Sequence, residues 1–349
     1  MLGIDLFCGA GGLTLGAIQA GITVRLGIDK DPNACKTYRK NHPDVECLTI
    51  DLARESLKCP KFKSNSLIIF GGPPCQGFST SNQKTRNVDN PGNWLFKRYF
   101  QSVGELNPRF FVLENVSGIL QTERGFFIQQ IRRTARRLGY GTTIVELDAQ
   151  EFGLPQRRRR VFIIGHKKSL TLNLDDSKKG IAITVRDAIV DLPFLRGQSK
   201  EGVLPYSSRP LSQYAASLRK TASGCDGHIV SRNASYVLER YRYIPPGGNW
   251  KSIPRGMMRN YSDRTRCHTG IYRRLEWDKP SIVIGNFRKN MLIHPKEHRG
   301  LSIREAARLQ SFPDSYSFEG SIGKQQQQVG NAVPPELARI VFANLLLYC

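Results

Sequence analysis

The feature that most constrains this chain is a regular alternation of short apolar runs with amphipathic helical patterns over its first 165 residues. Such alternation is typical of parallel β-strands joined by crossover helices. It predicts helices that include 12–20, 33–41 and 94–106. It predicts strands at 3–6, 24–28, 46–49, 67–70, 110–113, 143–147 and 161–164. We therefore expect a doubly wound, mostly parallel α/β sheet.

The alternation stops in a second region. From Thr184 to Glu297 the sequence is rich in Pro, Gly, Ser, Arg and Tyr and has few long periodic stretches. Periodicity returns in a capping box at 302–305, which opens a helix through Leu309, and in a final apolar helix over 335–347. We expect that last helix to pack on the first domain. The predicted domains are 1–183, completed by 325–349, and a smaller loop-rich domain over 184–324.

The balance of charge indicates a polyanionic partner. Lys and Arg total 52 against 29 Asp and Glu, which gives a formal net charge of +23. Such an excess destabilises the compact state by self-repulsion unless a polyanion neutralises it, and nucleic acid is the obvious polyanion. A basic protein with a merely solvated surface has the same composition, so the motifs must decide.

The cysteines and the first residues indicate the compartment. The eight cysteines contain no Cys-x-x-Cys pair and no spacing of the kind that binds zinc, so we expect free thiols, a reducing interior and no metal. Asp5 interrupts the only early apolar run, and we therefore expect neither a signal peptide nor a membrane span. These features predict a soluble intracellular protein.

Polar or reactive residues follow five of the predicted strands at their carboxyl ends. In an open parallel sheet, ligands bind beyond these ends, which share one edge. The residues are Asp5 with the glycine turn after it, Asp29, Asp51, Cys75, and Glu114 with Asn115. The sequence therefore predicts a single site at this edge.

The glycine turn suits a nucleoside cofactor. Gly9, Gly11 and Gly12 form a tight strand-to-helix turn. Asp29 follows Gly9 by 20 residues, the interval at which an acidic side chain meets a ribose diol. The third glycine of a dinucleotide fingerprint falls on a threonine, which favours a cofactor without phosphates. With S-adenosylmethionine, the glycine backbone would approach the methionine part, Asp29 would bind the ribose and Asp51 would accept from the adenine amino group. Glycines that only let a helix pack closely on a strand are the alternative.

Cys75 differs from the other cysteines near the start of the chain. Most cysteines are inert buried side chains, and Cys8, Cys35 and Cys47 fit that description. Cys75 instead follows two prolines, which fix the backbone and donate no amide hydrogen. A rigid turn at the end of an apolar strand suits a thiol that is positioned over a ligand.

Several blocks of the chain resemble, in order and spacing, the signature motifs of the cytosine-5 DNA methyltransferase family. The likeness covers 3–165 and 299–335 closely and the middle of the chain weakly, except around 272–275. The blocks are FGGPPCQGFS at 70–79, ENV at 114–116, QRRRR at 156–160, REAARLQSFP at 304–313 and QVGNAVPP at 328–335, with the turn at 5–12. The resemblance implies a Rossmann-like sheet of the class I methyltransferase type, S-adenosylmethionine as methyl donor with S-adenosylhomocysteine as product, and a target-recognition domain over 184–324.

The resemblance also implies a covalent mechanism. The Cys75 thiolate would attack carbon 6 of cytosine, so that carbon 5 becomes able to take a methyl group. Glu114 would protonate or hydrogen-bond the ring at nitrogen 3, where negative charge develops, although a structural ion pair is the alternative for this residue. Arg158 and Arg160 would lower the thiol pKa and anchor the base. The arginines that alternate with them would face away as surface charges.

By the same resemblance, residues along the sheet edge and near the C-terminus would bind S-adenosylmethionine. Asn331 and Val333 would close over its methionine end. Lys30 departs from the aromatic or apolar residue expected against adenine. The predicted set is Asp5, Phe7, Gly9, Gly11, Gly12, Asp29, Lys30, Asp51, Leu52, Pro74, Leu95, Asn331 and Val333.

An enzyme of this kind must reach a carbon that is stacked inside a duplex, so it flips the nucleotide out. The family has its target-recognition segment in the Arg-, Tyr- and Gly-rich region before residue 304. For each arginine there, a plain solvated charge is the alternative to a DNA contact. The predicted DNA contacts are Gln76, Ser79, Arg255, Arg259, Arg264, Arg266, Arg273 and Arg274.

The resemblance thus predicts a monomeric DNA (cytosine-5-)-methyltransferase that acts on a specific duplex sequence in the prokaryotic cytoplasm, at the nucleoid. Its expected partners are double-stranded DNA and, in function only, a cognate restriction endonuclease. An RNA cytosine-5 methyltransferase of the same fold is the first alternative, and the long recognition segment argues against it. An inactive DNA-binding relative is the second, but Cys75, Glu114 and Arg160 are all present.

Overall fold

The computed structural model describes residues 1–55, 57, 64–74, 94–168, 172, 174–195, 202–220, 222–259, 270–285, 287 and 291–349. The chain forms two compact units. Unit 1 consists of Met1–Ala149, Arg159–Lys178 and Val333–Cys349, and unit 2 of Gln150–Arg158 and Lys179–Ala332. The boundaries of the two units differ from those of the predicted domains. The functions assigned to the predicted domains stay predictions.

Unit 1 is built on a sheet that has seven strands within the described residues, in the order β3-β2-β1-β4-β5-β7-β6. Strands β1 to β5 pair in parallel, whereas β7 is antiparallel to both β5 and β6. The order reverses between β1 and β4, where open α/β sheets bind ligands. The strands are β1 (Leu2–Leu6), β2 (Thr23–Asp29), β3 (Glu46–Thr49), β4 (Leu67–Gly71), β5 (Phe110–Val116), β6 (Gly141–Asp148) and β7 (Arg159–His166). The predicted mostly parallel α/β sheet is confirmed.

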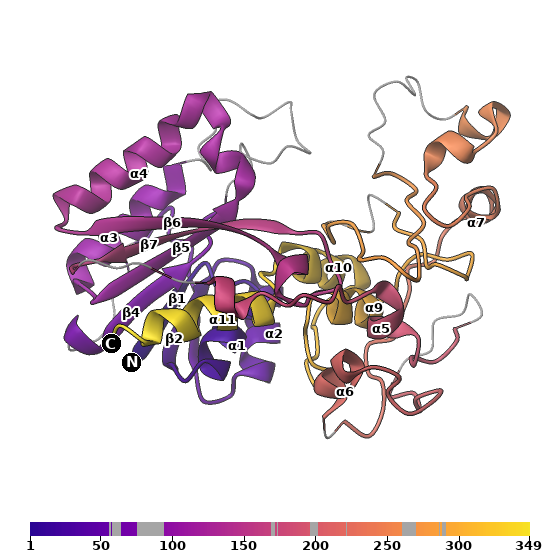
Figure 1. The fold of residues 1–349 in the computed structure, drawn as a ribbon, viewed down its shortest axis with the longest axis horizontal. Coiled ribbons are helices and arrows are strands. Elements are labelled where there is room, and N and C mark those ends of the chain that lie inside the picture. The colour runs from indigo at the N-terminus through magenta and orange to yellow at the C-terminus, as the bar shows by residue number, and fades with distance from the viewer. Residues whose placement is uncertain are drawn as a thin grey trace. The chain divides into compact units, whose positions relative to one another are not determined.

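Helices cover both faces of this sheet, with α3 and α4 on one side and α1, α2 and α11 on the other (Figure 1). Tyr99 on α3 is fully buried, and its hydroxyl lies 3.0 Å from the carbonyls of Ile69 on β4 and Val112 on β5. These contacts tie α3 to the two central strands. The helices are α1 (Gly12–Gln19), α2 (Pro32–Asn41), α3 (Leu95–Leu106), α4 (Phe126–Arg137) and α11 (Pro335–Leu346).

The hydrophobic core of unit 1 joins the sheet to α3 and α4. Alternate residues of the strands, such as Ile4, Leu6 and Ile69, belong to one buried cluster with Phe100 and Phe127. Alternation along a strand puts such residues on one face, so this face is buried by the two helices.

The C-terminal helix α11 packs on α1, as the sequence predicts. A Cβ at Gly16 would lie 2.5 Å from both the Ala338 Cβ and the Pro335 carbonyl oxygen. The two helices thus approach at a distance that only glycine permits. The end of the chain therefore completes unit 1.

Strand β5 runs three residues farther than the predicted strand over 110–113. Residues 114–116 pair antiparallel with residues 160–162 of β7. No long crossover helix separates β6 from β7, and neighbouring strands joined in this way run antiparallel. Glu114 therefore lies inside a paired strand rather than just after one.

Unit 2 is loop-rich, as predicted, and its described residues form isolated β-bridges rather than a named strand. Helix α9 (Ile303–Leu309) begins with the predicted capping box, in which Ser302 accepts from the Glu305 backbone N–H and donates its own N–H to the Glu305 carboxylate. The other helices of this unit are α5 (Val185–Ile189), α6 (Gln213–Arg219), α7 (Ser235–Arg242) and α10 (Ile322–Asn331). The short 3-10 helices of the described residues are η1 (Ser64–Ser66), η4 (Ser117–Leu120), η5 (Thr122–Gly125), η6 (Ala149–Phe152), η7 (Asp175–Ser177), η8 (Trp250–Ser252) and η9 (Arg255–Met258).

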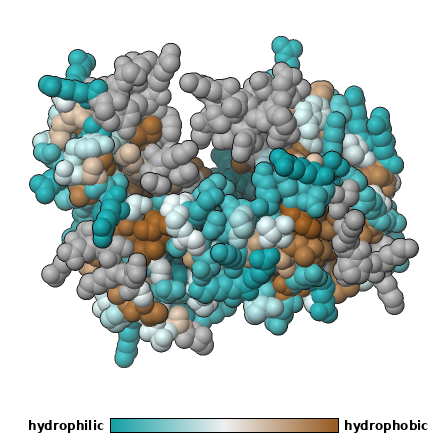
Figure 2. All heavy atoms as spheres, turned by 180° about the vertical axis from the view of Figure 1, so that it is seen from behind, coloured by the Kyte–Doolittle hydropathy of each residue, from teal (hydrophilic) through white to brown (hydrophobic). Residues whose placement is uncertain are grey.

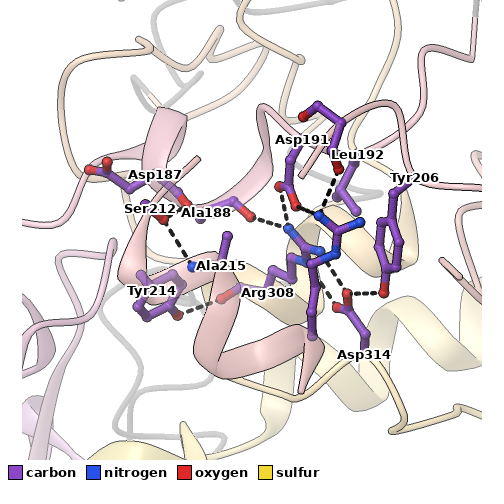
Figure 3. Close-up of polar contacts among 12 residues, drawn as sticks. Asp187, Ala188, Asp191, Leu192, Tyr206, Ser212, Tyr214, Ala215, Arg308 and Asp314 are labelled. Atoms are coloured by element: carbon purple, nitrogen blue, oxygen red, sulfur yellow. Dashed lines mark hydrogen bonds and ion pairs between the residues drawn. The ribbon is translucent and has the colours of Figure 1, made fainter. Parts of the chain in front are cut away.

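A buried ionic network joins α5, α6 and α9 within unit 2 (Figure 3). The fully buried Arg308 pairs with Asp191 and with Asp314, each at 2.6 Å. Arg219 pairs with Asp191 at 3.1 Å, and the Tyr206 hydroxyl donates to Asp314 at 2.6 Å. Burial lowers the pKa of Arg308, but the two carboxylates outweigh burial and raise it above its usual value. Removing one carboxylate would leave a buried charge without compensation, so the network fixes the arrangement of these helices.

The described surface is that of a polar protein. On the face drawn in Figure 2, hydrophilic side chains cover much of the coloured surface, and apolar ones gather in separate groups. No helix of the described residues is long and apolar enough to span a membrane.

Candidate functional site

The turn between β1 and α1 has an unusual backbone. Phe7, Gly9 and Gly11 have positive φ angles of 61°, 54° and 87°. For Phe7 this left-handed conformation costs energy, and it persists only where the surroundings impose it, as at many binding sites. The Cys8 N–H donates to the Ile28 carbonyl at 2.9 Å and holds the turn against β2. A Cβ at Gly9 would meet no atom within 4 Å, so the space beside the turn is open.

Asp29, at the end of β2, holds the turn from the side. One of its carboxylate oxygens accepts from the Gly9 backbone N–H at 2.9 Å, and the other accepts from that of Asp31 at 2.8 Å. Burial raises the pKa of Asp29, while these hydrogen bonds oppose the rise. Because a carboxylate oxygen can accept two hydrogen bonds, Asp29 can hold the turn and a ligand hydroxyl together.

A buried polar network lies beneath the turn. The Thr14 hydroxyl donates to Oδ2 of the fully buried Asp5 at 2.7 Å and lies 2.9 Å from the Tyr38 hydroxyl. Oδ1 of Asp5 has no hydrogen-bond partner among the described residues. Burial raises the pKa of Asp5 well above its usual value, and the nearby charge of Asp29 adds to the rise. Sequence reasoning missed Thr14 and Tyr38, although the threonine in place of a third glycine was a visible signal.

The other predicted cofactor residues lie in different places. Oδ1 of Asp51 accepts from the Ala53 backbone N–H at 3.0 Å just after β3, and Leu52 beside it is 4% exposed. Lys30 follows β2 and is exposed. Pro74 and Leu95 are half-buried and Val333 is buried, all in unit 1, whereas Asn331 is an exposed residue at the end of α10 in unit 2.

The ends of β4 and β5 meet at a carboxylate. A Cβ at Gly71 would lie 1.9 Å from the Leu6 carbonyl oxygen, and a Cβ at Gly72 would lie 2.7 Å from Oε2 of Glu114. The two glycines therefore let the end of β4 approach both β1 and Glu114. Oε1 of Glu114 pairs with Nε of Arg160 at 2.9 Å, and the two side chains are only 11% and 12% exposed. Sequence reasoning named the carboxylate and the arginine but missed Gly72.

The arginines of the motif at 156–160 alternate in exposure. Arg157 and Arg159 are exposed, Arg158 is buried and Arg160 is half-buried. Arg159 lies 3.5 Å from Asp148 across the β6–β7 pair. The predicted outward direction of the two intervening arginines is confirmed.

Arg158 lies in unit 2 with its guanidinium bound to backbone. It donates to the carbonyls of Ile284, Gly330 and Ala332 at 2.8 to 3.1 Å. The side chain thereby ties together segments of unit 2 that are far apart in sequence. Its predicted role beside the cytosine stays a prediction.

The predicted DNA contacts differ sharply in exposure. Arg255 and Arg259 are exposed, and Arg273 is half-buried with Glu276 at 3.8 Å. Arg274 is 2% exposed, and burial lowers its pKa to about 10. Its guanidinium donates to the carbonyls of Tyr241, Ile244, His294 and Glu297. We therefore do not propose Arg274 as a DNA contact.

Five predicted site residues lie outside the described residues. They are Cys75, Gln76, Ser79, Arg264 and Arg266. Within the described part of the chain, no group of three or more His, Cys, Asp or Glu side chains is arranged to hold a metal ion.

Comparison with known proteins decides the family. The sequence model for "C-5 cytosine-specific DNA methylase" matches residues 1–346. The chain belongs to this family. It is 35% identical to type II methyltransferase M1.HphI of Haemophilus parahaemolyticus over 98% of this chain and 86% of that protein. It is 32% identical to type II methyltransferase M.AgeI of Thalassovita gelatinovora over 96% and 97% of the two chains.

A solved structure agrees with this assignment. The crystal structure of a DNA modification methyltransferase encoded within an E. coli prophage matches with a TM-score of 0.77 and 27% identity over 99% of both chains. The predicted fold, the resemblance to the cytosine-5 DNA methyltransferases and the enzyme class are thereby confirmed.

The buried Asp5 predicts a pH dependence of stability. A carboxyl with a raised pKa keeps its proton in the folded state where the unfolded chain has lost it, so its favourable contribution is complete below the unfolded value of 3.8. That contribution is lost as pH rises through the folded pKa. Asp5→Asn removes this titration and keeps an acceptor for Thr14. As pH rises above about 4, the wild type should lose stability relative to the variant in urea denaturation without cofactor. Asp44→Asn, at an exposed position, is the control, and parallel profiles for Asp5→Asn and wild type would contradict the expectation.

The contact at Gly72 predicts a loss of activity without a loss of fold. In Gly72→Ala the new methyl group must displace the Glu114 carboxylate, which would lie 2.7 Å from it. A displacement of about 1 Å at a catalytic group lowers the rate by about 100-fold. The measurement is methyl incorporation into DNA, with thermal unfolding in parallel. The control is Gly180→Ala, since a Cβ there meets nothing within 4 Å. Equal turnover of the two variants would show that Glu114 is not held by Gly72.

Proposed function

We propose that this protein transfers a methyl group from S-adenosylmethionine to carbon 5 of cytosine in a specific sequence of duplex DNA. The observation that carries the proposal is the Glu114 carboxylate, which is paired with Arg160 at 2.9 Å and lies against Gly72, three residues before Cys75. A nearly buried carboxylate at the edge of the sheet where ligands bind, beside a motif that contains a cysteine, suits chemistry on a nucleobase.

The residues at the first turn fit S-adenosylmethionine. The open space at Gly9 and the Asp29 carboxylate beside it leave room for a ligand, with Asp5 buried beneath the turn. The Asp29 carboxylate favours a cofactor that carries positive charge and disfavours one that carries phosphates. Asp29 would bind the ribose, Asp51 the adenine amino group, and the turn the methionine part. When bound, S-adenosylmethionine supplies an electrophilic methyl group on a sulfonium.

The side chains of the protein then make the base reactive. The Cys75 thiolate adds to carbon 6 of the cytosine, which moves electron density to carbon 5 and toward nitrogen 3. Glu114 gives a proton to nitrogen 3 as negative charge develops there, and Arg160, 2.9 Å away, stabilises the carboxylate that results. Arg160 thereby acts through Glu114 as well as through its own charge. Once carbon 5 is methylated, its proton leaves to solvent, the nitrogen 3 proton returns to Glu114 and the cysteine is released, which restores the aromatic ring.

Duplex DNA is the proposed substrate. A net charge of +23 suits a polyanion, and a target carbon inside the base stack requires base flipping. The curated relatives M1.HphI and M.AgeI are named type II methyltransferases, which supports a protein of the same kind. Pairing with a restriction endonuclease stays a prediction.

Replacement of the nucleophile tests the proposal. Cys75→Ala should lower methyl transfer by at least about 1,000-fold, because the variant lacks the thiol proposed to add to carbon 6. Folding and binding of S-adenosylmethionine should remain, which thermal unfolding with and without the cofactor measures. Cys349→Ala, at the exposed end of the chain, is the matched control. Undiminished turnover by Cys75→Ala would rule out the covalent mechanism.

A further inference from the structure

Helix α7 in unit 2 has an outward face that the proposed chemistry does not use. Its buried residues are Val237, Arg240 and Tyr241. Tyr236, in the first turn of this helix, is 52% exposed, and Tyr243, its C-cap residue, is 47% exposed. Tyrosine is enriched among the residues that carry binding energy at interfaces, and this helix leaves two of them exposed.

The other side of α7 is anchored. Val237 and Tyr241 belong to a small buried cluster with Trp250 and Tyr272. Arg240 donates to the Met257 carbonyl at 2.8 Å and to the Tyr272 hydroxyl at 2.9 Å. Because side-chain packing and a buried guanidinium both fix the helix, its outer face is presented with defined geometry.

Three residues share that outer face. Tyr236, Glu239 and Tyr243 are spaced i, i+3 and i+7, so they lie in one row along the helix surface. The Arg240 guanidinium lies 4.9 Å from the centre of the Tyr236 ring and supports that ring from behind. Glu239 is thus an exposed carboxylate between two tyrosines.

The charge of Glu239 has no ion-pair partner within the described part of the chain. No hydrogen bond or ion pair of Glu239 occurs among the described residues, although Arg232, Arg242 and Arg255 nearby in the sequence are also exposed. A carboxylate repels DNA phosphates and weakens sequence-independent binding. It is useful on a DNA-facing surface where it accepts a hydrogen bond from a base, and cytosine offers its amino group in the major groove, which admits an α-helix.

We propose that the face of α7 formed by Tyr236, Glu239 and Tyr243 reads base edges of the target sequence, with Glu239 accepting from the amino group of a cytosine in the major groove. This inference rests on the proposed function, since it takes duplex DNA as the substrate. The tyrosines flank the contact and exclude water from it. Glu239 is therefore a specificity residue and takes no part in methyl transfer.

The test compares sequence selectivity rather than total activity. Wild type, Glu239→Gln and Glu239→Ala are each given a pool of duplexes that contains the target site and every single-base-pair change of it, and the methylated products are sequenced. At one C·G pair the discrimination against other base pairs should fall by about 5- to 150-fold in both variants. Glutamine can bind adenine through its amide. Glu239→Gln should therefore show its largest increase in methylation on duplexes in which that pair is replaced by A·T.

The matched control is Asp278→Asn, which makes the same acid-to-amide change at a side chain of unit 2 that is 77% exposed. It should keep the wild-type selectivity at every position. Unchanged selectivity of both Glu239 variants, or a uniform loss of methylation at all sites, would overturn the inference while leaving the proposed reaction intact. Absence of cytosine methylation by the wild type on any duplex would instead refute the proposed function, and this inference with it.

Discussion

The ion pair between Glu114 and Arg160 is the interaction on which the proposed catalytic centre depends. It exists because β7 returns antiparallel beside β5, so that residues 114–116 face residues 160–162. Both side chains are nearly buried, and removal of the arginine would take away the charged partner of the carboxylate. Gly72 brings the end of β4 against the same carboxylate. The position of the Glu114 carboxyl group is thus determined by three features together, which are the sheet topology, the ion pair and the missing Cβ at Gly72.

At the turn after β1, where the cofactor is proposed to bind, buried carboxyl groups again determine the local structure. Asp29 orders the glycine turn through backbone N–H groups, and Asp5 lies buried beneath it with only part of its hydrogen-bonding capacity used. Burial of two carboxyl groups costs stability, and the strained φ of Phe7 adds to that cost. Such costs collect at sites that bind ligands, because a ligand with complementary charge and donors recovers them.

The arginines show how composition can mislead about a surface. Arg158, Arg274, Arg304 and Arg308 are at most 2% exposed. Their guanidinium groups donate to backbone carbonyls or, in Arg308, also to carboxylates. A loop-rich unit has many carbonyls outside regular structure, and a buried arginine with five N–H donors can satisfy several of them. Part of the formal charge of +23 therefore organises unit 2 and does not face DNA.

The sequence was a good guide wherever the signal is local. Apolar runs located the strands, the capping box located α9, and the polar residues at strand ends located the turn and Asp29, whereas Glu114 lies inside β5 and not after it. Prediction from the sequence failed where the residue that a side chain contacts is distant in the sequence. Arg274 and Arg255 stand in equally basic surroundings, and only the fold shows that one is buried among carbonyls while the other is exposed. The role of Gly72 likewise depends on a carboxylate 42 residues away, which no local pattern encodes.

The most direct test of the account is a trapping experiment with duplex DNA that carries 5-fluorocytosine at the target position, in the presence of S-adenosylmethionine. Fluorine cannot leave carbon 5 as a proton does, so the enzyme should remain bonded to carbon 6 after methylation. The account predicts a complex that survives denaturing electrophoresis and a modified peptide that contains Cys75. A complex that dissociates on denaturation, from an enzyme that methylates the unmodified duplex normally, would contradict it.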